Sequence, residues 1–232
     1  MSLYRPRMSP ERAEQLRRWH EDASAELRER GEGDVEYLGL RLYVPPTVFP
    51  PAPMSKLLGR AVLGEATDSD RVLDMGTGCG VNAILAASTA REVVAVDLNP
   101  DAVAAARENC RRHGVDDRVQ CRVGDLFGPT DGVFDLIVFD PPFRWFAPAT
   151  LLEMAFADED YSTLTAFFEH VGDHLSPRGR VLVFFGTTGD LEYLEELVAG
   201  AALRSEVIAT AALGHDDGVE EYFVFRLTAD TG

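Results

Sequence analysis

The residues most able to do chemistry lie in a glycine-rich turn and beside it. Asp74 ends a short apolar run, and three glycines follow at alternate positions, Gly76, Gly78 and Gly80. A second acid, Asp97, closes the next apolar run. Such a turn lets backbone N–H groups and a helix N-terminus approach a ligand, while the second acid accepts hydrogen bonds from ribose hydroxyls. The pattern predicts a site for a nucleotide-type cofactor, either a dinucleotide or S-adenosylmethionine (SAM).

The spacing of the glycines favours SAM. A dinucleotide-binding turn has the pattern G-x-G-x-x-G, but here the third glycine comes one residue early and Val81 stands where that pattern needs Gly or Ala. The resulting G-x-G-x-G turn resembles motif I of the class I SAM-dependent methyltransferases. Asp97, GDLF at 124–127 and DPPF at 140–143 then follow in order. This ordered series carries the resemblance, because a single glycine turn is weak evidence.

Over residues 72–143 the chain resembles most closely the HemK-like methyltransferases, within the group that bears an (N/D)PP(Y/F/W) motif. Those enzymes methylate a glutamine side-chain amide in peptide release factors. The resemblance also reaches small-domain enzymes that methylate exocyclic amines of RNA bases. It implies an α/β, Rossmann-like class I methyltransferase fold, with a mostly parallel seven-stranded sheet, a C-terminal antiparallel hairpin and a helical N-terminal extension.

The same resemblance assigns roles to the cofactor-binding residues. The glycine loop and the acid before it would hold the methionine portion of SAM, and Asp97 would accept from both ribose hydroxyls. Asp125 would accept from the adenine amino group, between apolar contacts from two leucines. Carboxylates suit these roles because they are hydrogen-bond acceptors. The predicted cofactor-binding residues are Asp74, Gly76, Thr77, Gly78, Gly80, Asp97, Leu98, Asp125 and Leu126.

The DPPF motif indicates which kind of atom receives the methyl group. An amide or aromatic amine nitrogen is a poor nucleophile because its lone pair is delocalised. The Asp140 carboxylate and the Pro141 carbonyl can accept hydrogen bonds from both N–H groups and so direct the nitrogen lone pair toward the sulfonium methyl group. Catalysis would then rest on positioning and electrostatics. Pro142 helps to stiffen the loop, and Phe143 offers a flat face to a planar acceptor. These four residues are the predicted catalytic set, and no metal is expected.

The identity of the acceptor stays open, because the chain departs from the HemK-like pattern. Position 140 is Asp where that family has Asn, and the acidic, glycine-rich segment after the motif is replaced by FRWFAPATLLEMAFADEDY. A protein side-chain amide is the first expectation; a small molecule or an RNA base amine is the alternative. The net charge of −17 disfavours nucleic acid. A SAM-binding partner protein without catalysis and a nicotinamide-dependent oxidoreductase are rivals from other classes.

Alternating strands and helices must position these residues. Apolar runs without period-two polarity predict strands buried on both faces, and hence a parallel sheet. The predicted strands cover 71–75, 93–97, 119–123, 135–139 and 180–185, with a terminal antiparallel pair at 203–212 and 221–228 around the polar turn GHDDG. The predicted helices cover 80–89, 100–113, 160–175 and 190–200.

We divide the chain into an N-terminal part, residues 1–53, and a SAM-binding domain, residues 54–232. The first part begins with an amphipathic helix that Ser9 caps and Gly31 ends. The segment VPPTVFPPAP at 44–53 contains too many prolines for a helix or strand, so it is predicted to be a stiff loop. The expected elements are a helix at 9–30, a strand pair at 35–44, the loop at 44–53, and a helix at 54–63 leading into the core.

The bulk composition predicts an ordinary cytoplasmic globular protein. No apolar run reaches membrane-spanning length, and the charged N-terminus lacks a signal-peptide core. The 3 cysteines form no C-x-x-C pair, which predicts reduced thiols rather than disulfides or a metal site. His170 and His174 have metal-ligand spacing but lack the Glu of H-E-x-x-H, so we expect an ordinary helix pair.

Three loop segments contain further candidates. Thr47 and Phe49 either face the cofactor and acceptor or belong to a plain connector. Arg144 and the two aromatic residues after it, Trp145 and Phe146, either line the acceptor pocket or anchor a long loop. The acidic run at 158–160 is predicted to be a solvated helix start.

Overall fold

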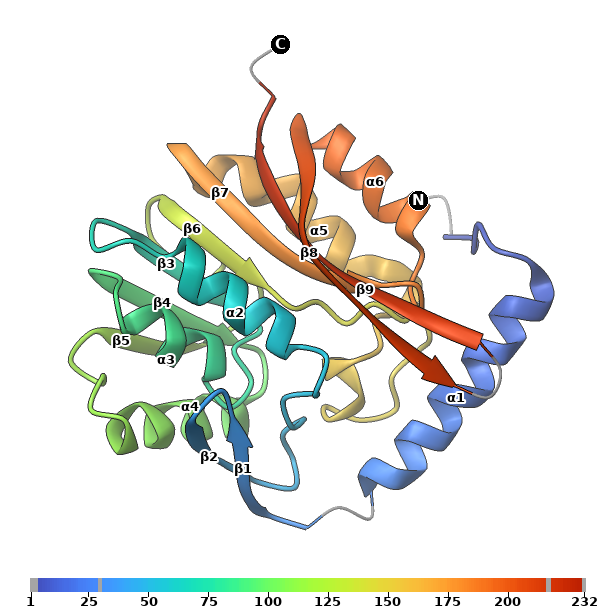
Figure 1. Ribbon diagram of the computed structural model, residues 1–232, viewed down its shortest axis with the longest axis horizontal. Helices are drawn as coiled ribbons and strands as arrows, with labels where there is room; N and C mark the ends of the chain where they lie inside the picture. The colour runs from blue at the N-terminus through green and yellow to red at the C-terminus, as the bar shows by residue number, and fades with distance from the viewer. Residues whose placement is uncertain (1–3, 29–30, 216–217, 231–232) are drawn as a thin grey trace.

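The computed structural model describes residues 4–28, 31–215 and 218–230. Its centre is a seven-stranded sheet in the order β5-β4-β3-β6-β7-β9-β8 (Figure 1). The pairs from β5 to β7 are parallel, and the pairs that β9 makes with β7 and β8 are antiparallel. The mostly parallel sheet and its C-terminal antiparallel hairpin are therefore confirmed. The strands are β3 (Arg71–Met75), β4 (Glu92–Asp97), β5 (Val119–Val123), β6 (Phe134–Phe139), β7 (Leu175–Gly186), β8 (Leu203–His215) and β9 (Gly218–Ala229).

Helices cover both faces of this sheet. Adjacent residues of β3 show why the strands lack polar alternation: Val72 and Leu73 are both 0% exposed, yet they belong to different core clusters. One cluster contains residues of α2 (Lys56–Glu65), α3 (Val81–Ala87) and α4 (Pro100–Arg112). The other contains residues of α5 (Ser162–His170) and α6 (Leu191–Gly200).

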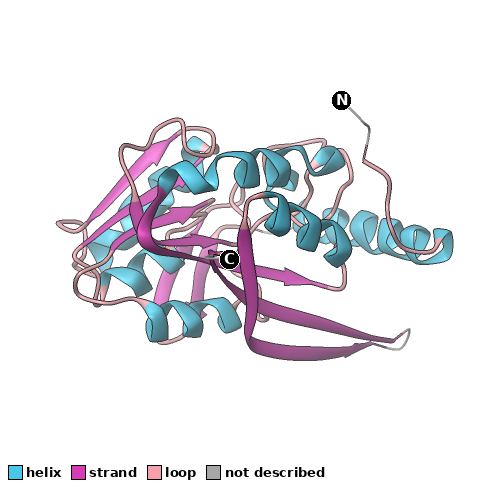
Figure 2. Ribbon diagram, turned by 90° about the horizontal axis from the view of Figure 1, so that it is seen from above, coloured by secondary structure: helices cyan, strands magenta, loops and turns pink. Residues whose placement is uncertain are grey.

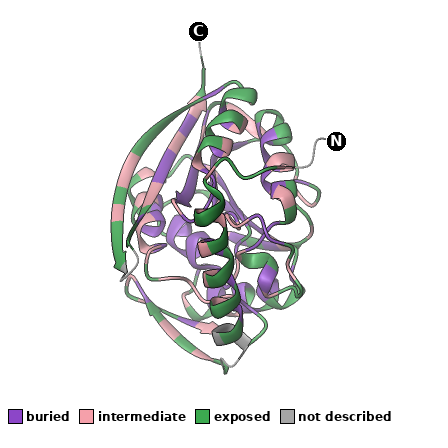
Figure 3. Cartoon of the chain, turned by 90° about the vertical axis from the view of Figure 1, so that its right-hand side faces the viewer, coloured by how far each residue is buried: buried purple, intermediate pink, exposed green. Residues whose placement is uncertain are grey.

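The N-terminal helix α1 (Pro10–Arg28) lies against the edge of the molecule near the far ends of β8 and β9 (Figure 1). The backbone N–H of Arg12 donates to Ser9 Oγ at 3.2 Å, which confirms the predicted cap. Leu16 is buried in the same core cluster as α5, whereas the outward face of the helix is exposed (Figure 3). The predicted end of this helix at 29–30 lies outside the described residues.

A small two-stranded sheet, β1 (Gly33–Tyr37) and β2 (Leu40–Val44), follows. Leu42 and Val44 pack in the core cluster that contains α2 and α3. The side chain of Asn109 on α4 also accepts from the Tyr43 N–H and donates to its carbonyl, both within 2.9 Å. The N-terminal part thus packs directly on the body of the molecule, and the domain boundary after residue 53 stays a prediction.

Several elements differ from their predicted bounds. β7 begins at Leu175, and the β8–β9 hairpin is longer than expected; Figure 2 shows it extending away from the helices. Both strands were predicted, at 203–212 and 221–228, but they continue into the polar segment GHDDG that was expected to be the turn, where Gly214 pairs with Val219. The helix predicted from 160 begins at Ser162, because Asp160 and Tyr161 both have a φ of +54°. The hairpin turn at 216–217 lies outside the described residues.

None of the described helices is both long and apolar enough to cross a membrane. Within residues 4–28, 31–215 and 218–230, no group of three or more His, Cys, Asp or Glu side chains could hold a metal ion. His170 is exposed and ends α5, while the His174 ring stacks on Phe127 with a centroid distance of 4.2 Å.

Candidate active site

A cavity of about 450 Å³ lies where the parallel strands β3, β4, β5 and β6 end. Ligands of open α/β sheets bind at this carboxyl edge. Every predicted site residue except Asp74 and Gly80 lines the cavity. We call the part formed by Gly76, Thr77, Gly78, Asp97, Leu98, Asn99, Asp125 and Leu126 the glycine-loop half. The part formed by residues 140–144, 47–55, 151–152 and 154–156, with Thr188 and Tyr222, is the DPPF half.

The glycine loop between β3 and α3 takes a path that other residues rarely follow. Gly76, Gly78 and Gly80 have φ values of +68°, +55° and +89°. At Gly80 an added Cβ would also lie 3.0 Å from the Cα of Ala106, because α4 packs directly behind the loop. The loop can therefore be thin enough to bring its backbone N–H groups to a ligand.

Asp74 holds this loop from behind the cavity wall. Its side chain is 1% exposed, and its Oδ2 accepts from Thr77 Oγ1 at 2.5 Å and from the Ala83 N–H at 2.9 Å. Burial raises the pKa of Asp74 to about 7, against the opposing effect of these two hydrogen bonds. The carboxylate thus fixes the loop to the start of α3. Its predicted contact with the methionine portion of SAM stays a prediction.

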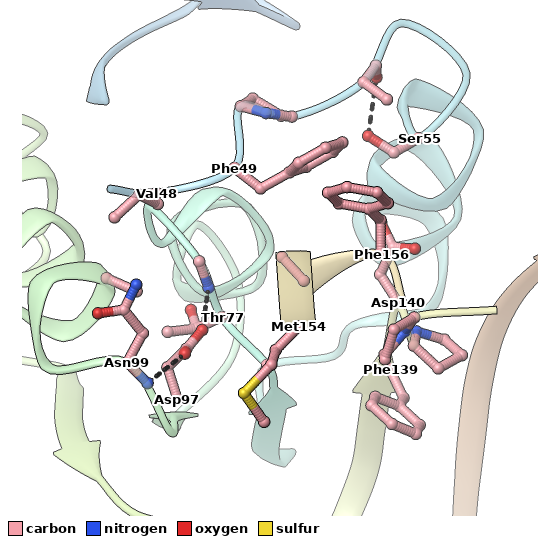
Figure 4. A pocket seen from close by; sticks show the side chains of 18 of the residues that line it. Val48, Phe49, Ser55, Thr77, Asp97, Asn99, Phe139, Asp140, Met154 and Phe156 are labelled. Carbon is pink, nitrogen blue, oxygen red and sulfur yellow. Dashed lines mark hydrogen bonds between the residues drawn. The ribbon is translucent and has the colours of Figure 1, made fainter. Parts of the chain in front are cut away.

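Asp97 links the glycine loop to the next segment. Its Oδ2 accepts from the Gly78 N–H and its Oδ1 from the Asn99 N–H, both at 2.8 Å (Figure 4). Burial raises the pKa of this carboxyl group. Each carboxylate oxygen retains a lone pair for a further donor. The Asn99 amide also donates to the Thr47 carbonyl at 2.9 Å, which ties the proline-rich loop to this half.

Leu98 and Asp125 present, respectively, an apolar surface and a carboxylate to the cavity. Leu98 is 44% exposed although it is apolar, so a flat ring placed on it would remove apolar surface from water. Asp125 is exposed on the wall of the same half, as the predicted adenine contact requires.

The DPPF motif follows β6 directly. Burial raises the pKa of Asp140 to about 7, and the negative charge of Asp74 adds to the effect. The Tyr161 hydroxyl donates to the Phe143 carbonyl at 2.8 Å, and the Phe143 ring packs 5.3 Å from that of Phe185. The motif is therefore held rigidly, with its one carboxylate on the cavity wall.

Two loops face each other over the DPPF half. The Phe49 ring from the proline-rich loop meets that of Phe156 at a centroid distance of 5.4 Å (Figure 4). Met154 also lines the cavity, and in Figure 4 its side chain points away from this ring pair, toward the side of Asp97. The loop at 44–53 therefore covers part of the cavity, with both Thr47 and Phe49 on its wall. Whether it covers bound cofactor stays open.

The segment after DPPF has residues that line the cavity and residues that anchor the loop in the core. Arg144 lines the cavity, whereas Trp145 and Phe146, each 8% exposed, pack into the core beside Leu16. Asp158 was predicted to be solvated, and this is wrong. It is 4% exposed and accepts from the N–H groups of Thr163 and Leu164, so it caps α5.

The polar wall residues that sequence reasoning missed include Asn82, Thr188 and Tyr222. Asn82 is 8% exposed, and its Oδ1 has no hydrogen-bond partner among the described residues. Its place two residues after the glycine turn was a usable signal. Thr188 and Tyr222 come from the segments after β7 and within β9, where no local motif marks them.

The sheet order, the helices on both faces and the cavity at the strand ends define the class I methyltransferase fold. The family model of the methyltransferase small domain matches residues 53–203, and the chain belongs to this family.

Curated relatives agree with this family. A release factor glutamine methyltransferase of Deinococcus radiodurans is 39% identical over 115 residues, which cover 48% of this chain and 41% of the relative. One from Yersinia pestis is 32% identical over 214 residues, covering 84% of this chain and 76% of the relative. For the first three curated relatives the match spans 39% to 54% of their own length.

Solved structures show the same fold. The M. jannaschii tRNA m1G37 methyltransferase superposes with a TM-score of 0.65 at 15% sequence identity, over 88% of this chain and 58% of that one. The predicted Rossmann-like methyltransferase architecture is thereby confirmed.

Proposed function

We propose that this protein is a SAM-dependent N-methyltransferase that acts on an amide or planar amine nitrogen, first of all a protein side-chain amide of the glutamine type. The observation that carries the proposal is the position of Asp140. It is a half-buried carboxylate in a rigid Pro-Pro loop, on the wall of the same cavity as Asp97 and the glycine loop.

The glycine-loop half fits SAM. The unpartnered Oδ1 of Asn82 is an acceptor suited to an ammonium group, and Asp97 has spare lone pairs for ribose hydroxyls. Leu98 and Asp125 offer an apolar face and an acceptor for adenine. Thr77 and Leu126 complete this wall. Bound there, SAM would supply an electrophilic methyl group on a sulfonium.

The DPPF half presents the acceptor. The Asp140 carboxylate and the Pro141 carbonyl accept hydrogen bonds from the N–H groups of the methyl acceptor. These bonds direct the nitrogen lone pair toward the methyl group of SAM. As the nitrogen becomes tetrahedral and gains positive charge, the carboxylate stabilises that charge. Phe143 and Pro142 lie on the same wall and confine a planar group.

The names of the relatives support a glutamine side chain as the acceptor. A small molecule is the second candidate, because Phe49 and Phe156 meet over the DPPF half and narrow the approach to Asp140. An RNA base amine is the weakest of the three, given the net charge of −17.

The test is methyl transfer from labelled SAM into extract of a strain that lacks the gene, separated into protein, RNA and small-molecule fractions. An Asp140→Ala variant is the control for transfer at this site. Label in one protein band, lost with the variant, supports the amide proposal. Label confined to small molecules or RNA overturns the protein acceptor. A protein that binds SAM but labels nothing is the non-catalytic alternative.

A further inference from the structure

The basic residue that follows the DPPF motif has no assigned task. Among the described residues that line the cavity, Arg144 is the only one with a basic side chain. Its Nη1 is buried and has no hydrogen-bond partner in the described part of the chain. Burial lowers the pKa of the Arg144 guanidinium. A cation stripped of water without a bonded partner is costly, unless a ligand supplies the missing anion.

The neighbouring acid does not fill this need. Glu220 on β9 is 2% exposed, and both of its oxygens accept from Arg12 Nη2, at 2.8 and 2.7 Å. The Thr187 hydroxyl donates to the same carboxylate at 2.7 Å. The Glu220 carboxylate therefore binds α1 and the loop after β7. The guanidinium of Arg144 remains available to the cavity.

The position of Arg144 separates it from the glycine-loop half. Tyr222 on β9 lines the same cavity as Arg144. In the sheet order β9 lies three strands from β3, on the far side of β6, which carries Asp140 at its end. At about 4.8 Å per strand, β9 lies roughly 14 Å from β3, the strand that leads into the glycine loop.

We propose that Arg144 binds a carboxylate of the methyl acceptor, so that the acceptor carries its nitrogen toward Asp140 and an anionic group toward β9. A guanidinium forms charge-assisted and bidentate hydrogen bonds with a carboxylate, which would satisfy the buried nitrogen. Phe143, Phe184 and Leu152 add apolar side chains to the same cavity wall, which suits a short apolar linker. The inference deepens the proposed function and rests on it for the identity of the ligand as acceptor.

Binding of named probes tests this inference without any methyl transfer. The full chain is saturated with S-adenosylhomocysteine, and dissociation constants are measured for N-acetylglutamine and for its neutral isostere N-acetylglutaminamide. We expect the carboxylate probe to bind at least tenfold more tightly. In Arg144→Gln this ratio falls to below twofold, while affinity for S-adenosylhomocysteine stays within twofold. Arg60→Gln, which removes an exposed charge on α2, keeps the ratio.

A second pair of probes separates two sources of the carboxylate. Acetyl-Gln-Glu-amide against acetyl-Gln-Gln-amide tests a side-chain carboxylate next to the glutamine, as in a protein, while N-acetylglutamine tests a terminal one, as in a small molecule. A preference for the acidic member in either pair, lost in Arg144→Gln, supports the inference. Arg144→Lys keeps the positive charge but loses the bidentate geometry of the guanidinium, so it should retain part of the preference. It also serves as the test variant if Arg144→Gln does not fold.

Equal binding of charged and neutral probes by the wild-type protein, or binding of none of them, overturns the inference. So does a tenfold loss of S-adenosylhomocysteine affinity in Arg144→Gln, since the residue would then serve the cofactor. A protein that shows the carboxylate preference but transfers no methyl group would instead contradict the proposed function.

Discussion

The glycine-loop half of the cavity is held by hydrogen bonds within one short stretch of chain, whereas the DPPF half is assembled from distant segments. In the first, Asp74 accepts from Thr77 Oγ1 and the Ala83 N–H, and Asp97 accepts from the Gly78 N–H, so all of these donors lie between the two acids in sequence. In the second, Phe49, Arg144 and Tyr222 meet from three separate parts of the chain. A site for an invariant cofactor can be encoded locally, while a site for a particular acceptor depends on how remote elements dock.

The largest expected effect tests how far the DPPF half depends on α1. Arg12→Gln removes the partner of the buried Glu220 and a bond to the Thr187 carbonyl. We expect a loss of about 3 kcal/mol in the free energy of unfolding, because one buried charge is left unpaired. Urea denaturation measures it. Arg111→Gln, which breaks an exposed pair with Glu108, should cost less than about 0.5 kcal/mol. Equal losses in the two variants would contradict the dependence on α1.

The next effect tests the local construction of the glycine loop. Gly80→Ala should cost about 2 to 3 kcal/mol in unfolding free energy, since it combines a left-handed φ with a Cβ 3.0 Å from Ala106. Gly78→Ala has the same kind of strain but open space around its Cβ, so about 1 to 2 kcal/mol is expected. Thermal or urea unfolding of both variants gives the comparison. A smaller cost at Gly80 than at Gly78 would show that α4 does not confine the loop.

The difference in pH dependence between the wild-type protein and Asp140→Asn probes the DPPF half, because Asp74 behind the glycine loop also has a pKa raised to about 7. Asp140 has a pKa raised to about 7, so it loses its proton as the pH rises through 7 and only then accepts hydrogen bonds from the acceptor at full strength. Transfer at saturating SAM should therefore increase about tenfold between pH 6 and pH 8. Asp140→Asn accepts at every pH, so its profile should lose the tenfold rise, and any smaller slope that remains belongs to Asp74. A wild-type rate that falls with pH would contradict the assignment.

The smallest effects sharpen the division between the halves. Phe156→Ala opens the wall opposite Phe49 and should raise the KM for the acceptor about fivefold, with SAM affinity within twofold. Leu98→Ala, in the glycine-loop half, should raise the KM for SAM about fivefold and leave the KM for the acceptor within twofold. Steady-state kinetics with each substrate varied in turn measures both. If the two variants shift the same constant, the halves are not separate.

The sequence predicted the local part of this arrangement well. The glycine loop, Asp97 and the DPPF motif each lie at a strand end, and apolar runs mark buried parallel strands clearly. The length of the β8–β9 hairpin was underestimated because the polar, glycine-containing segment GHDDG has the composition of a turn although its ends still pair as strands. Asp158 was misjudged for a related reason: an acid that caps a helix is buried by its tertiary surroundings, which its sequence neighbours do not reveal.

The remote residues of the acceptor side could not be predicted, because they share no sequence spacing with the DPPF motif. Tyr222 and Thr188 reach the wall only because β7 and β9 pair beside β6. Arg144 was a candidate because it follows the motif, but its buried, unpartnered nitrogen is a property of the folded chain.

The most direct test compares Asp97→Ala with Asp140→Ala in two assays, calorimetric binding of S-adenosylhomocysteine and transfer of labelled methyl groups to extract. Asp97→Ala should weaken binding at least tenfold, since it removes a charged acceptor of hydrogen bonds. Asp140→Ala should keep binding within twofold and lower transfer at least a hundredfold. Weakened binding in Asp140→Ala to the same degree, or undiminished transfer, would contradict a cavity divided between cofactor and acceptor.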